Sequence, residues 1–251
     1  LCSGRTQRFL EMDIDKFMGA ITCNGSHTEV EGEVIRDICI PDELVFQVVN
    51  EYFPRDTIIH FETRDISYYL HMDEEFFKNH CKLFNLPQRW YAPWKFRTKN
   101  THISKLVMNY KDIQVKKDFE EEFKDVFTCA KHVRENFIDI TLKGVTKGDA
   151  ITELIEKLGI DKKDTYAFGD ADNDVEMMQA VGTGIAMGRH SEKVGEVASM
   201  VTGILNIRPS LFLKNGEVNV SGLCRTRKKS VANVFESCKK YFTSRNIDPN
   251  T

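Results

Sequence analysis

The sequence lacks the features that mark several classes of protein. No apolar run approaches the ~18 to 20 residues that a membrane-spanning helix needs, so we expect no transmembrane segment and no membrane partner. The 35 Lys and Arg residues nearly balance the 38 Asp and Glu residues, which leaves a formal net charge of -3. So small a net charge gives the whole chain no electrostatic reason to bind nucleic acid or an anionic surface.

Patterns of cysteine and histidine that hold structural zinc are absent too. The seven cysteines are odd in number and widely separated, and none lies at metal-ligand spacing from another. The seven histidines form no His-x-x-x-His pair. Residues 1–5 do not show a basic region followed by an apolar stretch, which is the pattern of a secretory signal. We therefore expect reduced thiols and a cytoplasmic location.

Helices and strands alternate clearly in the second half of the chain. The Thr-x-x-Asp spacing at 146–149 is typical of a helix start, and apolar residues recur at helical spacing over 151–158. Residues 165–168 and 184–187 are short apolar runs, with a helix between them whose first turn Asp172 can cap. Strands that are apolar on both faces and alternate with helices indicate a doubly wound parallel sheet in an α/β fold.

Composition divides the chain into four regions. We expect residues 1–26 and 141–204 to form the α/β core. Residues 27–140 combine strands of mixed polarity with charged helices, which indicates an α+β cap inserted into the core. Within the cap, residues 90–94 hold both tryptophans and are expected to pack inside the layer rather than to form a wall over a substrate. Residues 205–251 form a separate tail.

The tail has nine Lys and Arg residues against three Asp and Glu residues. Its apolar runs at 211–213 and 218–220 flank an Asn-Gly pair, which predicts a β-hairpin, and a basic amphipathic helix follows over 230–242. Both elements carry more large apolar side chains than a disordered segment normally does. We therefore expect them to dock on a sheet edge or an outer face of the core. The basic segment 225–245 is the only candidate patch for nucleic acid. We favour the alternative, in which this helix docks on the core by its apolar side and its basic residues face water.

The run Gly169-Asp170-Ala171-Asp172-Asn173-Asp174 is the most distinctive motif. It joins an expected strand to a helix, at the edge where open α/β sheets bind ligands. Two carboxylates, Asp170 and Asp174, can hold a hard cation such as Mg²⁺, one directly and one through water. The alternative is an acidic turn that only caps the helix.

Five short motifs follow one another along the chain. They are Ser3-Gly4-Arg5, Cys23-Asn24-Gly25, Lys-Gly-Val-Thr-Lys-Gly at 143–148, the Gly169 to Asp174 run, and Ala186-Met187-Gly188. Their order resembles the haloacid dehalogenase superfamily and, more narrowly, the Cof-type, class IIB sugar-phosphate phosphatases. The resemblance covers about residues 1 to 202. It implies a Mg²⁺-dependent phosphomonoesterase of small phosphorylated metabolites, such as sugar phosphates, with an α+β cap on a Rossmann-like core.

The resemblance also implies roles for individual residues. Ser3, Lys147 and Asp170 would be catalytic, and Asp170 with Asp174 would hold Mg²⁺. A hydroxyl, an ammonium and paired carboxylates at one sheet edge suit phosphoryl transfer, which depends on positioning and charge neutralisation. Lys147 also opens a helix, where a cation opposes the helix dipole, so stability does not account for it. The residues that would bind the phosphate are Ser3, Gly4, Arg5, Asn24, Gly25, Lys147 and Asn173.

One part of the family pattern is not in the printed sequence. Members of the family carry Asp-x-Asp-Gly-Thr before the Ser-Gly-Arg motif, and its first Asp is the nucleophile. Asp13 and Asp15 are expected to be loop carboxylates, because Lys16-Phe17 replaces the small residues that let backbone amides approach a phosphate. Without that nucleophile we expect catalysis by this chain to be impaired. The alternative is a non-catalytic protein of the same fold that binds a phosphate ligand or a partner.

Overall fold

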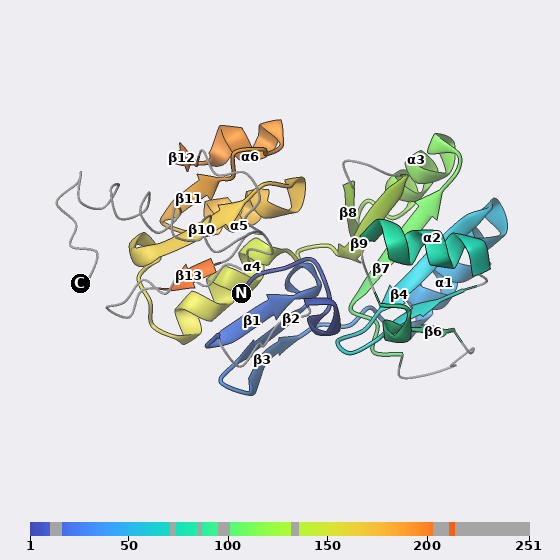
Figure 1. The fold of residues 1–251 in the computed structure, drawn as a ribbon, viewed down its shortest axis with the longest axis horizontal. Helices are drawn as coiled ribbons and strands as arrows, with labels where there is room; N and C mark the ends of the chain where they lie inside the picture. Colours follow the sequence, from blue (N-terminus) through green and yellow to red (C-terminus); the bar gives the residue numbers. More distant parts are fainter. Residues whose placement is uncertain are drawn as a thin grey trace.

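The chain folds into two lobes, and the sequence passes from the first lobe to the second and back (Figure 1). One lobe holds strands β1 to β3 and the helices and strands described after residue 146, and the other holds strands β4 to β9. No helix in the described parts of the chain is long and apolar enough to cross a bilayer. The computed structural model describes residues 1–10, 17–70, 74–84, 87–94, 101–131, 136–202 and 211–213, so Asp13 and Asp15 lie outside the described residues.

The first lobe contains a sheet with the strand order β12-β11-β10-β13. Strands β10, β11 and β12 are parallel, as the alternation of helices and strands predicts. An antiparallel sheet of β1, β2 and β3 lies beside it, and Cys2 forms a parallel bridge to Ile21 of β1. The strands are β1 (Gly19–Thr22), β2 (His27–Val30), β3 (Glu33–Asp37), β10 (Thr165–Gly169), β11 (Thr183–Ala186), β12 (Met200–Val201) and β13 (Leu211–Leu213).

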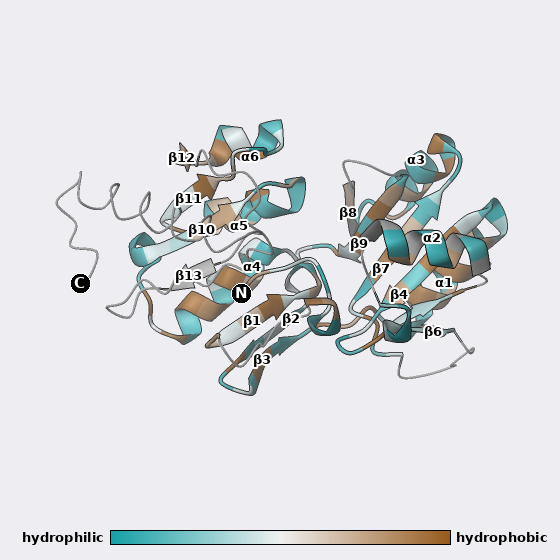
Figure 2. Ribbon diagram, viewed as in Figure 1, coloured by the Kyte–Doolittle hydropathy of each residue, from teal (hydrophilic) through white to brown (hydrophobic). Residues whose placement is uncertain are grey.

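Three helices cover these strands: α4 (Lys147–Lys157), α5 (Val175–Ala180) and α6 (Glu192–Val197). Helix α4 begins as predicted, because Thr146 accepts from the Asp149 amide and the Asp149 carboxylate accepts from Thr146. Its buried Ile151 and Leu154 share one apolar cluster with Ile21 of β1 and Ala167 of β10. Hydrophobic residues accordingly gather on α4 and on the strands beside it (Figure 2). One helix thus ties both sheets into a single core.

The second lobe is built on a six-stranded sheet in the order β6-β5-β4-β7-β9-β8. All neighbouring pairs are antiparallel except β5 with β6. The strands are β4 (Thr57–Glu62), β5 (Ser67–Tyr69), β6 (Tyr91–Pro93), β7 (Lys105–Tyr110), β8 (Phe127–Lys131) and β9 (Phe137–Leu142). The helices are α1 (Asp42–Tyr52), α2 (Glu74–Phe84) and α3 (Ile113–Glu122).

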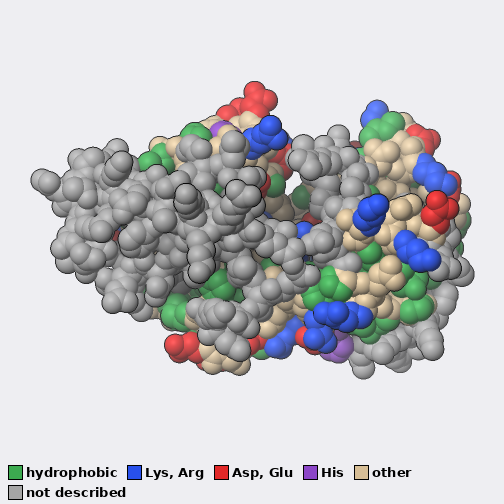
Figure 3. Space-filling model, in the orientation of Figure 1, with side chains coloured by type: hydrophobic (Ala, Val, Ile, Leu, Met, Phe, Trp, Pro, Cys, Tyr) green, Lys and Arg blue, Asp and Glu red, His purple; other side chains and the backbone are tan. Residues whose placement is uncertain are grey.

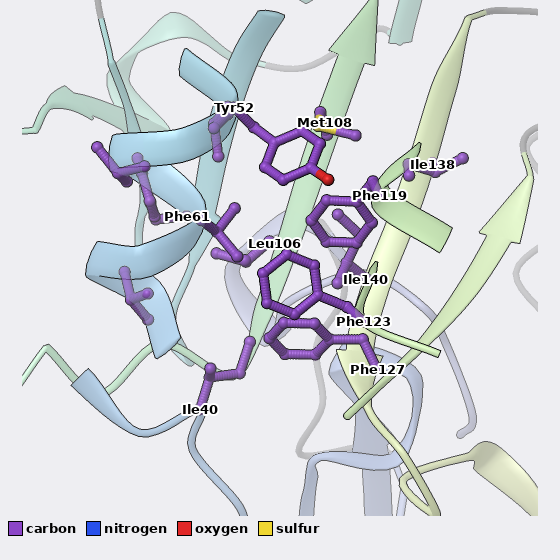
Figure 4. Packing of buried hydrophobic residues seen from close by; sticks show 14 of the residues in the cluster. Ile40, Tyr52, Phe61, Leu106, Met108, Phe119, Phe123, Phe127, Ile138 and Ile140 are labelled. Carbon is purple, nitrogen blue, oxygen red and sulfur yellow. The ribbon is translucent and has the colours of Figure 1, made fainter. Parts of the chain in front are cut away.

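One face of this sheet carries the largest apolar cluster of the described residues. Tyr52 of α1 meets Phe119 of α3 edge to face, with 4.9 Å between ring centroids, and Leu106 and Met108 of β7 lie in the same cluster (Figure 4). Because side chains alternate along a strand, Lys105, Val107 and Asn109 of β7 point to the opposite face. That second face holds several buried polar residues.

Both tryptophans pack inside the second lobe, which confirms the packing interpretation. Trp94 stacks on Phe61 with 4.5 Å between ring centroids. Trp90 stacks on Phe9 at 5.5 Å, and both indoles are buried. Phe9 comes from a short 3-10 helix, η1 (Gln7–Leu10), so the segment after Ser3 reaches into the second lobe.

The boundary of the cap needs adjustment. The expected boundary at residue 27 falls inside the antiparallel sheet, whose pairing joins residues 19–22 to 27–30 and 33–37. A cut at that point would break the β1 to β2 ladder. We therefore propose that the cap begins after Asp37 and ends near Leu142, where β9 gives way to the loop before α4.

The tail contributes one described strand. Strand β13 pairs antiparallel with β10, with Leu211 opposite Ala167 and Leu213 opposite Thr165. It is the last strand in the described order of its sheet, which agrees with the expected docking at a sheet edge. The second half of the expected hairpin and the basic helix lie outside the described residues.

Candidate active site

The loop after β10 is closed by Asp174. Its Oδ2 accepts hydrogen bonds from the backbone N–H groups of Asp170, at 2.9 Å, and Ala171, at 3.1 Å. The expectation that Asp172 caps the following helix is wrong, because that helix, α5, begins after Asp174. Asp172 Oδ2 instead lies 3.3 Å from Lys193 Nζ. A turn in which the last carboxylate bonds back to the first two amides holds the Asp170 side chain at the end of β10.

Lys147 and Asp174 form a buried ion pair. Lys147 Nζ lies 2.6 Å from Asp174 Oδ1, and the two side chains are 4% and 1% exposed. Burial is the largest single effect and lowers the pKa of Lys147, but the negative charges around the ammonium, led by Asp174, together hold that pKa above its usual value. The ammonium therefore stays charged at neutral pH. Asp174 takes one of its three N–H donors, which leaves capacity to bind another anion.

The loop after β1 takes a left-handed turn beside this pair. Cys23, Asn24 and Gly25 all have positive φ, at 51°, 56° and 98°. A Cβ at Gly25 would collide with the backbone carbonyl of Thr146, so only glycine fits against the start of α4. This close approach sets the buried Asn24 next to the first turn of α4.

The Ser3-Gly4-Arg5 segment completes the group of loops. Ser3 N donates to Ile21 O at 2.9 Å, and Ser3 Oγ accepts from Arg5 N at 3.2 Å. The Ser3 hydroxyl hydrogen therefore remains available for an acceptor. A Cβ at Gly4 would lie 2.5 Å from Asn24 Oδ1 and 3.1 Å from Asn173 Nδ2. Gly4 thus brings all three loops into contact.

The residues expected from the sequence mostly meet at this point. Asn173 Nδ2 donates to Asn24 Oδ1 at 2.9 Å, which links the loop after β10 to the loop after β1. Arg5 belongs to the same group of loops, because its backbone carbonyl accepts from the Cys23 N–H at 2.9 Å. Between the two lobes the surface is hollowed, with acidic and basic side chains near the opening (Figure 3).

Asp170 is the exposed carboxylate of the group. Partial removal from water raises its pKa, the nearby Asp174 raises it further, and Lys147 opposes both. This carboxylate fits one ligand position of a magnesium ion. Asp174 already accepts hydrogen bonds from Lys147 and from two backbone amides, which leaves little of its acceptor capacity for a cation. In the described ranges no three Asp, Glu, His or Cys side chains cluster as a metal site, so water or the phosphate itself would have to complete the octahedral shell of Mg²⁺.

Three charged residues of the site region were not expected from the sequence. Lys105, Glu62 and Asp139 are all buried, and they lie on β7, β4 and β9 of the cap sheet. Lys105 Nζ lies 2.9 Å from Glu62 Oε2 and 3.3 Å from Asp139 Oδ2. A charged residue within an apolar strand, as in Phe-Ile-Asp-Ile at 137–140, was the sequence signal that could have identified them. Such residues are rarely buried unless they are paired.

Known proteins match parts of this chain in sequence. A Geobacillus stearothermophilus protein described only as lying in the pdhA 5' region is 55% identical over 64 residues, which are 26% of this chain and 67% of that protein. Phosphoglycolate phosphatase of Methanosarcina acetivorans is 40% identical over 58 residues, 23% of this chain and 26% of that enzyme. Since that match spans about a quarter of the enzyme, its name alone assigns no activity to this chain.

Solved structures share the fold. The subclass IIB sugar phosphatase BT4131 superposes with a TM-score of 0.68 at 24% identity, over 79% of this chain and 77% of that one. The sequence model of haloacid dehalogenase-like hydrolases matches residues 1–206, which is most of the chain. This chain belongs to the haloacid dehalogenase-like hydrolase family.

Proposed function

We propose that the loops around Lys147 bind the phosphate group of small phosphorylated metabolites, such as sugar phosphates, in a phosphomonoesterase. The observation that carries the proposal is the buried Lys147 ammonium, paired with Asp174 where three loops converge. An ammonium buried in this way costs desolvation energy, which a dianionic ligand would help to offset. The names of the related phosphoglycolate phosphatase and sugar phosphatase support the same substrate class.

Each proposed contact has a stated chemical role. The Lys147 ammonium would neutralise charge on the phosphoryl oxygens, and the Ser3 hydroxyl would donate to one of them. The Gly4 backbone lies against Asn24 and Asn173, so a phosphate there would meet three loops at once. Arg5, Gly25 and Asn173 remain proposed contributors to the same phosphate site.

Magnesium belongs to the proposal through Asp170. When bound, Mg²⁺ would supply further charge neutralisation at the phosphoryl group. We expect weak binding by this chain, because the described residues offer one exposed carboxylate and Asp174 supports it only indirectly. Calorimetry with MgCl₂ tests this: Asp170→Ala abolishes binding, while the neighbouring Asp172→Ala keeps it. Equal binding by Asp170→Ala and the parent chain would show that the site assignment is wrong.

Turnover separates catalysis from simple binding. Residues 1–251 are expected to hydrolyse hexose phosphates negligibly with Mg²⁺, because the printed sequence contains no Asp-x-Asp-Gly-Thr nucleophile motif. The same chain preceded by a strand that carries this motif should turn over. Robust hydrolysis by residues 1–251, abolished by Asp13→Ala or Asp15→Ala, would contradict the interpretation of Asp13 and Asp15 as loop carboxylates. The second candidate is phosphate-ligand binding without turnover. An extended chain that binds sugar phosphates but never hydrolyses them would support it.

A further inference from the structure

The polar face of the cap sheet contacts the core through Lys105. It does so at the first of the three loops of residues 3–5, 23–25 and 170–174, which we propose bind phosphate and call the phosphate loops. This side chain is 4% exposed, and its Nζ donates to the backbone carbonyl of Gly4 at 2.9 Å. Burial lowers the pKa of Lys105, but Asp139 and then Glu62 outweigh burial and hold that pKa above its usual value. A charged donor from the cap therefore fixes the backbone of the Ser3-Gly4-Arg5 loop.

A second connection runs through side-chain amides. Asn24 Nδ2 donates to Asp139 Oδ2 at 3.1 Å, and Asn24 Oδ1 accepts from Asn173 Nδ2 at 2.9 Å. The direction of this chain is fixed, because the Asp139 carboxylate can only accept and so turns the NH₂ group of Asn24 toward itself. The carbonyl end of Asn24 must then face Asn173. One carboxylate of the cap thus orients two loops of the core.

The backbone of Asn24 requires such support. Asn24 and the preceding Cys23 are both left-handed, at φ of 56° and 51°. For residues other than glycine this conformation costs on the order of 1 kcal/mol or more each, and it persists only where the surroundings hold it. The hydrogen bonds of Asn24 to Asp139 and Asn173 are the side-chain contacts that do so.

We infer that Asp139 and Lys105 are positioning residues of the phosphate site, acting from the cap on the Asn24 and Gly4 loops. The inference rests on the proposed function, because it names the cap residues that set phosphate affinity at that site. Asp139 does not itself bind the phosphate, since a carboxylate repels that anion. Its effect passes through Asn24. Phosphate affinity should therefore depend on a residue whose charge alone would oppose binding.

The test compares the affinity for inorganic phosphate of four chains by calorimetry: the parent, Asp139→Ala, Asn24→Ala and the double variant. Loss of the Asp139 negative charge would, by Coulomb's law, tighten phosphate binding. Loss of the positioning contact should instead weaken binding by about fivefold, which corresponds to about 1 kcal/mol. In the Asn24→Ala background the same substitution should weaken binding by about twofold at most, because the linked amide is gone. Asp118→Ala, which removes a cap carboxylate paired with Arg55, is the matched control and should leave affinity unchanged.

The outcomes separate this inference from the proposed function. Tighter or unchanged binding by Asp139→Ala, or the same weakening in both backgrounds, overturns the positioning role. A parent chain that binds no phosphate refutes the proposed function itself. If Asp139→Ala does not fold, the nearly isosteric Asp139→Asn replaces it, and NMR follows the side-chain NH₂ signals of Asn24 and Asn173. Both signals should shift when the acceptor loses its charge, and an unchanged Asn173 signal would overturn the relay.

Discussion

At the scale of single residues, the site depends on charges buried in pairs. Lys147 and Asp174 are nearly inaccessible to water, and each compensates the charge of the other. Asp174 has further support from two backbone amides, while Asp174 is the hydrogen-bond partner of the Lys147 ammonium among the residues that the structure describes. Removal of the lysine should therefore leave a buried carboxylate only partly satisfied.

We expect Lys147→Met to lower the free energy of unfolding by about 3 to 5 kcal/mol, the range for breaking a buried ion pair. Urea denaturation of the purified chain measures this. Lys143→Met is the matched control, because Lys143 forms an exposed pair with Asp125 at 3.2 Å, and it should cost less than about 1 kcal/mol. Similar losses in the two variants would mean that burial does not strengthen the Lys147 pair.

Asp170 gives a prediction with a definite pH dependence. Its pKa in the folded chain lies above the usual 3.8, so the folded state holds the proton more tightly than the unfolded state. Stability from this group is therefore greatest at low pH and falls as pH rises from 3.8 through the folded pKa. Asp170→Asn removes that loss, so the variant should be more stable than the parent at pH 7 and lose its advantage near pH 3. Denaturation curves at both pH values decide, and a variant that is less stable at pH 7 would contradict the expectation.

At the scale of elements, the turn after β1 is constrained by contact as well as by its backbone conformation. Gly25 and Gly144 both have positive φ, at 98° and 76°. A Cβ at Gly25 would strike the Thr146 carbonyl, whereas a Cβ at Gly144 would meet no atom within 4 Å. Gly144→Ala should therefore cost about 1 kcal/mol for its backbone alone. Gly25→Ala should cost at least roughly twice as much and weaken phosphate binding. Equal unfolding free energies for the two variants would refute the close contact.

Strand β13 can be tested by hydrogen exchange. The pairing of Leu211–Leu213 with β10 predicts that amides in this segment exchange at least about tenfold more slowly than in an unstructured peptide. Disruption of β10 pairing by Phe212→Pro should remove that protection, because proline cannot donate to the ladder. Exchange of Leu211–Leu213 at peptide rates in the parent chain would show that the tail does not dock on this sheet.

Local signals in the sequence predicted the elements better than the contacts between them. The start of helix α4 was predictable because the two capping residues, Thr146 and Asp149, lie only three positions apart in the sequence. The sequence did not predict that Asp174 closes the turn after β10, because Asp172, two positions earlier, carries the same carboxylate group. The link from Asn24 to Asp139 spans 115 residues of sequence, and no periodic pattern encodes a contact of that range. The motif resemblance pointed to the loops that we propose bind phosphate, but their contacts with Lys105 and Asp139 of the cap appear only in the fold.

At the scale of the whole molecule, the two lobes meet on both sides of the phosphate loops. Phe9 packs against Trp90 and Tyr91 of the cap, while Lys105 binds the carbonyl of Gly4 five residues earlier in the chain. Apolar and charged contacts thus hold the same segment. A site built across two lobes can select a ligand by both its phosphate and the group attached to it.

The most direct test of the phosphate site is a calorimetric titration of residues 1–251 with a hexose 6-phosphate and with the free hexose. The phosphorylated sugar should bind in competition with inorganic phosphate, and the free sugar should give no measurable binding. Folded Lys147→Met should bind the phosphorylated sugar at least about tenfold more weakly, with Lys143→Met unchanged, since a charged hydrogen bond contributes roughly 1.5 to 3 kcal/mol. Equal binding of the two sugars, or unaltered affinity in folded Lys147→Met, would contradict a phosphate site at Lys147.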